Sequence, residues 1–254
     1  MLHLPSSDEG YTTDWAISVL FLENYKMMFT DSFPNVSPLR AMWSVCVEEH
    51  FYLLWGLALY FLPIKKLPGL ILCSILLANV VRILYVHLNL SSLDLFSTID
   101  YFAYGAIPAF VLATNSKVLK KVNDIPLWIK YAIVLITLTG IFTLPHLNYT
   151  VLTFFSPILL GILFSSIILF TLTTSNRIYI KDDSLGIYTY GLYLYHTIVI
   201  NLMLQLLKDT TLEMKTLIIG ITAFVLTVLI SMASYHLFER KFLILKRYFY
   251  RKSR

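Results

Sequence analysis

Hydrophobic residues in this chain form long blocks separated by short polar stretches, without the strict alternation of half-buried strands. Seven blocks are long enough to cross a bilayer as helices, and they cover residues 43–62, 67–88, 97–114, 127–145, 152–174, 186–207 and 215–238. A helix satisfies its own backbone polar groups in lipid, so such blocks are typical of membrane spans. The pattern predicts an all-α fold, namely a polytopic transmembrane helical bundle of about seven spans.

The segment before the first block has a different pattern. Residues 15–30, WAISVLFLENYKMMFT, are amphipathic and are interrupted by Glu23 and Lys26. They predict an interfacial helix or the frayed end of a span. The chain then divides into an extracytoplasmic N-terminal segment, a membrane domain and a basic cytoplasmic tail, at residues 1–42, 43–238 and 239–254.

Composition supports a membrane protein. Of the 254 residues, 57% are hydrophobic and 14% are charged, whereas a soluble domain has about 25% charged residues. Cys46 and Cys73 both fall in predicted spans and show neither a disulfide framework nor a metal-ligand spacing. No metal site is expected, and the sequence has no glycine-rich nucleotide loop and no internal repeat of the kind found in many transporters.

The basic residues predict the orientation. Lys and Arg gather in alternate loops, at residues 65–66, 117–121 and 177–181, and in the tail. By the positive-inside rule these loops and the C-terminus are cytoplasmic. The net charge of +5 is then a topology signal with contacts to anionic lipid, and no nucleic-acid partner is expected. Because this orientation places the acidic segment 1–42 outside, we expect an odd number of further spans before Met1.

Candidate chemistry begins with the stretch WSVCVEEHFYLLW at the start of the first predicted span. Ser44, Glu48 and Tyr52 are spaced four residues apart and share one helix face, with Trp43 and Glu49 beside it. A bare carboxylate in a membrane costs several kcal/mol, so it is normally paired or faces a wet cavity. The stretch is either part of an outward-facing polar site or a pair of glutamates that ends the helix at its positive pole.

Two further polar residues lie inside predicted spans. Arg82, in the second span, lies at a depth comparable to that of Glu48. A pair between them is either a structural contact between helices or an anion clamp over a reaction centre. His196 lies near the middle of the sixth span among tyrosines, and is either a satisfied core histidine or a functional group.

The stretch WSVCVEEHFYLLWG resembles the signature of the acyltransferase-3 family, the membrane O-acyltransferases that decorate lipopolysaccharide, peptidoglycan and other surface glycans. It departs from that signature at Val45 and Gly56. Four further stretches resemble the family in the same order along the chain: LFLENYKMMF, IDYFAYGAIPAFVLA, LGIYTYGLYLYHTIVI and FERKF.

This resemblance implies a reaction and its substrates. The enzyme is an O-acyltransferase, expected to be an O-acetyltransferase, that uses acetyl-CoA or another acyl-CoA as donor and has no bound cofactor. The acceptor is a hydroxyl of a surface glycan or glycolipid, and the location is the bacterial cytoplasmic (inner) membrane. The family core has ten spans, and its catalytic histidine follows a basic residue by eleven positions. No histidine in this sequence has Lys or Arg at that spacing.

The resemblance also implies roles for the singled-out residues. As catalytic positions, Glu48 orients the base or binds the acceptor, and His196 supports the inner part of an acyl channel. The substrate-binding positions are Arg82, Glu49, Ser44, Tyr52 and Trp43. Two alternatives remain open. The chain is a non-catalytic remnant or accessory subunit that needs a missing N-terminal segment or a partner, or it is a transporter.

Overall fold

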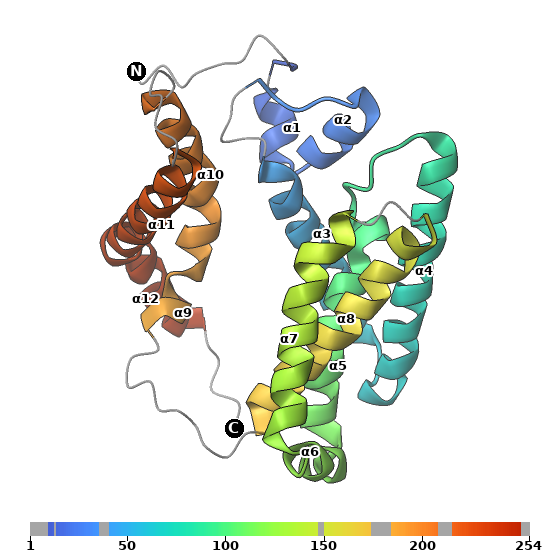
Figure 1. Ribbon diagram of the computed structural model, residues 1–254. Coiled ribbons are helices and arrows are strands. Elements are labelled where there is room, and N and C mark those ends of the chain that lie inside the picture. The colour runs from blue at the N-terminus through green and yellow to red at the C-terminus, as the bar shows by residue number, and fades with distance from the viewer. Residues whose placement is uncertain are drawn as a thin grey trace. The chain divides into compact units, whose positions relative to one another are not determined.

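The computed structural model describes residues 10–12, 14–35, 41–146, 150–173, 184–207 and 215–249 (Figure 1). Regular secondary structure in these residues is helical, apart from one isolated bridge between Tyr11 and Pro34. The chain divides into two compact units. The larger unit comprises Asp14–Ser32 and Met42–Arg177, and the smaller comprises Met1–Thr13, Phe33–Ala41 and Ile178–Arg254. The predicted all-α fold is confirmed.

In its described residues, the larger unit contains two short helices, five long ones and three connecting pieces. They are α1 (Trp15–Val19), α2 (Glu23–Thr30), α3 (Met42–Phe61), η2 (Ile64–Lys66), α4 (Leu67–Leu88), α5 (Leu95–Thr114), α6 (Ser116–Asn123), α7 (Leu127–Thr143), η3 (Leu144–His146) and α8 (Thr150–Thr173). The described helices of the smaller unit are α9 (Ser184–Ile187), α10 (Thr189–Leu206), α11 (Lys215–Ser234), the π-helical turn η4 (Tyr235–Glu239) and α12 (Arg240–Phe249).

The seven predicted blocks are all helical in the structure, as α3, α4, α5, α7, α8, α10 and α11. Within the described residues, four helices are long and apolar enough to cross a membrane: Ile64–Leu88, Leu95–Thr114, Phe154–Thr173 and Thr216–Leu245. A fifth is added if α6 and α7, which meet at a bend of 89°, form one span. Two of the seven predicted spans, α3 and α10, are not among these helices, because polar residues interrupt their otherwise apolar sequences. The chain is a multi-pass membrane protein.

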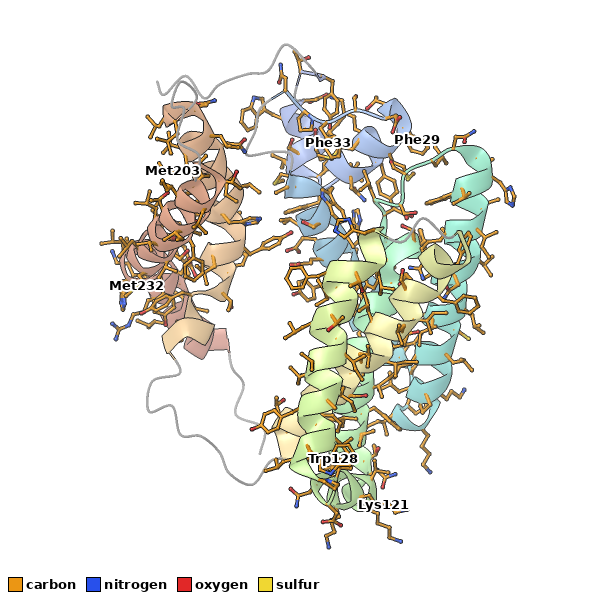
Figure 2. The ribbon with its side chains drawn as sticks, in the orientation of Figure 1. Phe29, Phe33, Lys121, Trp128, Met203 and Met232 are labelled. Atoms are coloured by element: carbon orange, nitrogen blue, oxygen red, sulfur yellow. The ribbon has the colours of Figure 1, made fainter. Side chains whose placement is uncertain are left out.

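Large apolar side chains cover the outside of the helices. Trp128 at the start of α7 is 71% exposed and Phe29 on α2 is 69% exposed (Figure 2). Soluble monomers rarely expose contiguous apolar surface on this scale. Exposed apolar surface on this scale is typical of a chain whose helices contact lipid.

The hairpin between α4 and α5 is defined by a cap on each side of its turn. Asn89 ends α4 in the left-handed conformation, and the Leu90 amide then donates to the Tyr85 carbonyl at 2.9 Å. Asp94 begins α5, because its carboxylate accepts from the Ser97 amide at 3.0 Å. These two local caps make α4 and α5 antiparallel neighbours.

The contact between α5 and α8 depends on a proline. Pro108 lies inside α5 and has no N–H to donate to the carbonyl of Tyr104, four residues earlier. The Ser165 hydroxyl of α8 donates to that carbonyl instead. The Tyr104 ring also lies against Gly161, where an added Cβ would come within 2.2 Å of the ring. Both contacts require α8 to approach α5 closely.

Residues 15–30, predicted to be an interfacial helix or the frayed end of a span, do not form one continuous helix. The structure has two short helices, α1 and α2, with Phe21 between them at a positive φ of 56°. The break brings the Ser18 hydroxyl to the Glu23 carboxylate, with 2.9 Å between Oγ and Oε2. Because its carboxylate is hydrogen-bonded in this way, Glu23 is fully buried and α2 packs against α3.

In the smaller unit, α10 and α11 pack closely along a glycine. A Cβ added at Gly191 would lie 2.9 Å from the Cβ of Ser231. Hydroxyls of Tyr195 and Ser234 are hydrogen-bonded at 3.0 Å. Beyond the predicted end of the last span, the chain continues as helix through η4 to the end of α12, so the predicted tail begins as helix.

Candidate functional site

The end of the larger unit at which α4 turns into α5 is rich in buried polar side chains. Asn24 of α2 donates through Nδ2 to the Leu93 carbonyl at 3.1 Å. The Tyr85 hydroxyl of α4 donates to Asp94 Oδ2 at 3.1 Å. We call the group Glu23, Asn24, Tyr25, His50, Arg82, Tyr85, Asp94 and Asp100 the polar cluster. It draws on α2, α3, α4, the α4–α5 turn and α5.

An apolar core determines which face of α3 is turned inward. Val47 belongs to a buried cluster with residues of α4 and α5, and Trp43 and Phe51 pack against this cluster. The rings of Phe51 and Phe102 stack with their centroids 4.0 Å apart. Trp43, predicted to bind substrate, thus packs against the core of the larger unit.

The polar residues of α3 lie on two opposite flanks of this inward face. On one flank, Cys46 is fully buried and the His50 ring lies 5.6 Å from the Tyr25 ring of α2. On the other flank are Ser44, Glu48 and Tyr52, because residues four apart share a face and residues two apart do not. We call these three residues the signature face.

The signature face is accessible within the larger unit. Ser44 and Glu48 are half-buried, and Tyr52 is 61% exposed. Glu49 is also exposed, on the side of α3 away from the core. The predicted grouping of Ser44, Glu48 and Tyr52 on one face is consistent with the helix, and their predicted roles stay predictions.

Arg82 is paired with Asp100, and the predicted pair with Glu48 does not form. The guanidinium is bidentate, with Nη1 2.9 Å from Oδ1 and Nη2 2.7 Å from Oδ2 of Asp100. Nη1 also donates to the Ser97 carbonyl at 2.8 Å, and Nη2 donates to Asn79 Oδ1 at 3.2 Å. Asp100 is fully buried, and the Arg82 side chain is 12% exposed.

The hairpin explains this choice of partner. Arg82 lies seven residues before the Asn89 cap, and Asp100 lies six residues after the Asp94 cap. The antiparallel helices therefore place the two side chains opposite each other. The sequence carried a signal for Asp100, since it is a carboxylate inside a predicted span and such groups are normally paired.

Several polar atoms of this region have further hydrogen-bonding capacity. Among the residues that the structure describes, the buried side-chain atoms without a hydrogen-bond partner are Asn24 Oδ1, His50 Nδ1, Arg82 Nε, Ser91 Oγ and Thr197 Oγ1. All but the last belong to α2, α3, α4 or the α4–α5 turn. An unpaired buried polar group costs about 1–3 kcal/mol. A region with four of them is suited to bind a hydroxylated or charged ligand.

Tyr25 adds a hydroxyl to the polar cluster from α2, outside the predicted spans. Burial, and secondly the negative charge of Asp94, raise the pKa of the Tyr25 hydroxyl above its ordinary value. It therefore stays protonated at neutral pH and is available as a hydrogen-bond donor.

His196 lies in the smaller unit. Its Nδ1 is hydrogen-bonded to the Tyr193 carbonyl, and its ring lies 5.8 Å from the Tyr193 ring. His196 also lines a cavity of about 240 Å³ between α10 and α11, together with Ile200 and Phe224. Its predicted support of an acyl channel stays a prediction.

A metal centre has no candidate ligands in the described ranges, where no group of three or more His, Cys, Asp or Glu residues is arranged to hold an ion. Cys46 and Cys73 are free thiols. The functional groups of the polar cluster are carboxylates, an amide, hydroxyls, an imidazole and a guanidinium.

Comparison with known proteins gives one match. A family model described as an acyltransferase domain covers residues 5–236. No curated protein and no solved structure matches the chain. The matched region includes the signature face, the polar cluster, all of the larger unit and most of the smaller one. The chain therefore belongs to the acyltransferase-3 family and is a membrane acyltransferase.

Proposed function

We propose that this protein is an O-acyltransferase that moves an acyl group, expected to be acetyl, from acyl-CoA to a hydroxyl of a cell-surface glycan or glycolipid. Membership of the family supports acyl transfer, and the resemblance of its motifs supports a thioester donor and a glycan acceptor. The proposed location is the bacterial inner membrane, with the C-terminus in the cytoplasm, as the basic loops indicate.

The observation that carries the proposal is the accessible carboxylate of Glu48 on a helix that is held from both sides. Val47 and Phe51 anchor α3 in the apolar core, and His50 contacts α2 on the opposite flank from Glu48. These contacts fix the helix that carries the carboxylate, while the carboxylate itself stays half-buried. Preorganised polar groups of this kind are what acyl transfer requires.

The reaction has a simple balance. The acceptor hydroxyl attacks the thioester carbonyl, a C–O bond forms, the C–S bond breaks and the CoA thiol leaves. The hydroxyl proton passes to a base, which contributes about 10²–10⁴ in rate, and stabilisation of the oxyanion contributes about 10²–10³. We assign to Glu48 the binding of the acceptor hydroxyl or the orientation of the base.

Arg82 and Asp100 have a supporting role in this proposal. Their bidentate pair joins α4 to α5, and both helices form the apolar core against which α3 packs. The pair thus keeps the surface on which Glu48 depends in a fixed arrangement. We regard Arg82 as a positioning residue, since Asp100 already satisfies both of its terminal nitrogens.

The test is the Glu48→Gln variant of the full chain, produced in cells whose surface glycan is acetylated by this protein. Acetate released from the glycan by alkali is expected to fall by at least about a hundredfold. The control is Asp124→Asn, which also replaces a carboxylate by an amide, at an exposed position after α6. This variant is expected to release the wild-type amount of acetate. Full acetylation by Glu48→Gln would refute the assignment to Glu48.

A second function, binding of the acceptor without catalysis, has one specific observation in its favour. No histidine in the sequence follows Lys or Arg by eleven positions, the spacing at which the resemblance expects the base. If the wild-type chain binds the glycan but no acetate is incorporated in any host, the binding role replaces the enzymatic one.

A further inference from the structure

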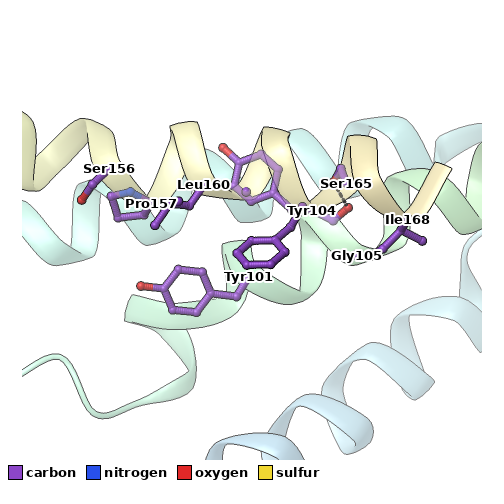
Figure 3. Close-up of a pocket in the computed structure, with 10 residues that line it drawn as sticks. Tyr101, Tyr104, Gly105, Ser156, Pro157, Leu160, Ser165 and Ile168 are labelled. Atoms are coloured by element: carbon purple, nitrogen blue, oxygen red, sulfur yellow. Dashed lines mark hydrogen bonds between the residues drawn. The ribbon is translucent and has the colours of Figure 1, made fainter. Parts of the chain in front are cut away.

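A groove lies between α5 and α8 in the larger unit. Its volume is about 430 Å³, within the ~300–1,000 Å³ typical of small-molecule sites. One wall is a stripe of α8, in which Ser156, Leu160, Phe164 and Ile168 follow one another at four-residue spacing. Tyr101 and Gly105, also four residues apart, line the other wall from α5 (Figure 3).

The two ends of the groove are lined differently, apart from Ser165 near Ile168, whose hydroxyl is already bonded to the Tyr104 carbonyl (Figure 3). The hydroxyl-bearing residues Tyr101 and Ser156 lie at one end, and Ile168 lies at the other (Figure 3). Both α5 and α8 meet the length and hydropathy requirements of a membrane span. The apolar part of the groove therefore lies at hydrocarbon depth, where an aliphatic chain binds without the loss of any hydrogen bond.

The polar end of the groove is continuous with the polar cluster. Tyr101 lines the groove, and its ring centroid lies 5.9 Å from the Arg82 guanidinium carbon. Arg82 is in turn paired with Asp100, the residue that precedes Tyr101 in α5. A molecule with its chain in the groove would have its head beside hydroxyls and this ion pair.

We propose that the groove binds the aliphatic chain of an amphiphilic acceptor, with its hydroxylated head at the end formed by Tyr101 and Ser156. This inference rests on the proposed function: of the two acceptors named there, a glycan or a glycolipid, it selects the one attached to an alkyl chain, and it assigns the groove as the binding site of that chain. The gradient from hydroxyls to Ile168 matches the gradient from head to tail of such a molecule. A bilayer phospholipid or a helix of another protein are the competing occupants.

Gly105 offers a direct way to fill the groove. A Cβ added there meets no atom within 4 Å, so a larger side chain enters open space without displacing backbone. Gly69 on α4 is equally open and is not among the residues that line the groove, which makes it a matched control. Gly161 is unsuitable because its added Cβ would overlap the Tyr104 ring.

The experiment is photolabelling of the full chain in phospholipid vesicles with a long-chain alkyl glucoside that carries a diazirine in its chain. Labelled peptides are expected from α5 and α8. Gly105→Phe is expected to reduce this labelling by at least about tenfold, and Gly69→Phe to leave it unchanged. Excess unlabelled alkyl glucoside should compete, and an equal excess of phosphatidylglycerol should not.

Each other outcome overturns the proposal. Unchanged labelling in Gly105→Phe, or labelling outside α5 and α8, means that the groove does not hold the probe. Equal competition by phosphatidylglycerol identifies a site for bilayer lipid, and a co-purified protein that blocks labelling identifies a helix interface. If Gly105→Phe lowers the unfolding temperature, Ile168→Trp fills the apolar end instead. Photolabelling needs no acyl donor, so labelling of the groove is measured independently of acetylation, and failure of the reaction and failure of the groove are distinguishable.

Discussion

Ser165 of α8 donates a hydrogen bond to the backbone carbonyl of Tyr104 in α5, which Pro108 has left without a partner within its own helix. In hydrocarbon no water is present to satisfy such a carbonyl, so a neighbouring helix has to do so. A residue that interrupts the hydrogen bonding of one helix thus determines where the next one packs. The groove between α5 and α8 lies along the same contact.

The first prediction concerns this bond. Ser165→Ala is expected to lower the free energy of unfolding by about 1–3 kcal/mol, because the buried carbonyl loses its partner. Pro108→Ala restores an amide donor within α5, so in that background Ser165→Ala is expected to cost less. Thermal unfolding in one detergent gives this double-mutant cycle. Ser166→Ala is the control, since Ser166 bonds only within its own helix, and equal costs in both backgrounds would contradict the mechanism.

The second prediction concerns the buried ion pair. Asp100→Ala leaves the Arg82 guanidinium buried without its counter-charge and is expected to destabilise the protein by about 3–5 kcal/mol. Replacement of both residues, Arg82→Met with Asp100→Leu, is expected to recover most of this loss. Denaturant titration of the three variants checks this. A double variant as unstable as Asp100→Ala would show that the pair does more than neutralise its own charges.

The third prediction compares two glycines on the walls of the groove. Gly161→Ala places a Cβ 2.2 Å from the Tyr104 ring, so it is expected to destabilise the protein by about 1–3 kcal/mol through overpacking. Gly105→Ala enters open space and is expected to be neutral or to stabilise by roughly 0.5–1 kcal/mol, as alanine does in helices. Unfolding temperatures of the two variants give the comparison, and the reverse order would contradict the packing.

The fourth prediction follows from the raised pKa of Tyr25. The native state holds the phenolic proton to a higher pH than the unfolded state does, so stability is complete below pH ~10 and falls as the pH rises beyond it. Tyr25→Phe removes this titration and is expected to reduce the alkaline loss of stability. Melting temperatures between neutral pH and pH ~11 test this, and an identical alkaline loss in wild type and variant would exclude Tyr25 as its source.

The asymmetry of α3 shows what the order of residues can and cannot reveal. The spacing of Ser44, Glu48 and Tyr52 correctly puts these three on one helical face. The same spacing puts His50 on another face, but it does not reveal that this face lies against Tyr25 of α2. That contact depends on where the inward-facing Val47 and Phe51 point, which is decided by contacts with residues far along the chain.

The sequence by itself determined the helices, their apolar character and the family. These depend on local properties, because a bilayer requires long apolar blocks and caps such as Asp94 act on residues within a single turn. Only the tertiary structure decided that Arg82 pairs with Asp100, that Glu23 is buried and that Ser165 satisfies the carbonyl of Tyr104. The physical reason is that each of these depends on which face of one helix meets which face of another, and distant packing contacts fix that rotation.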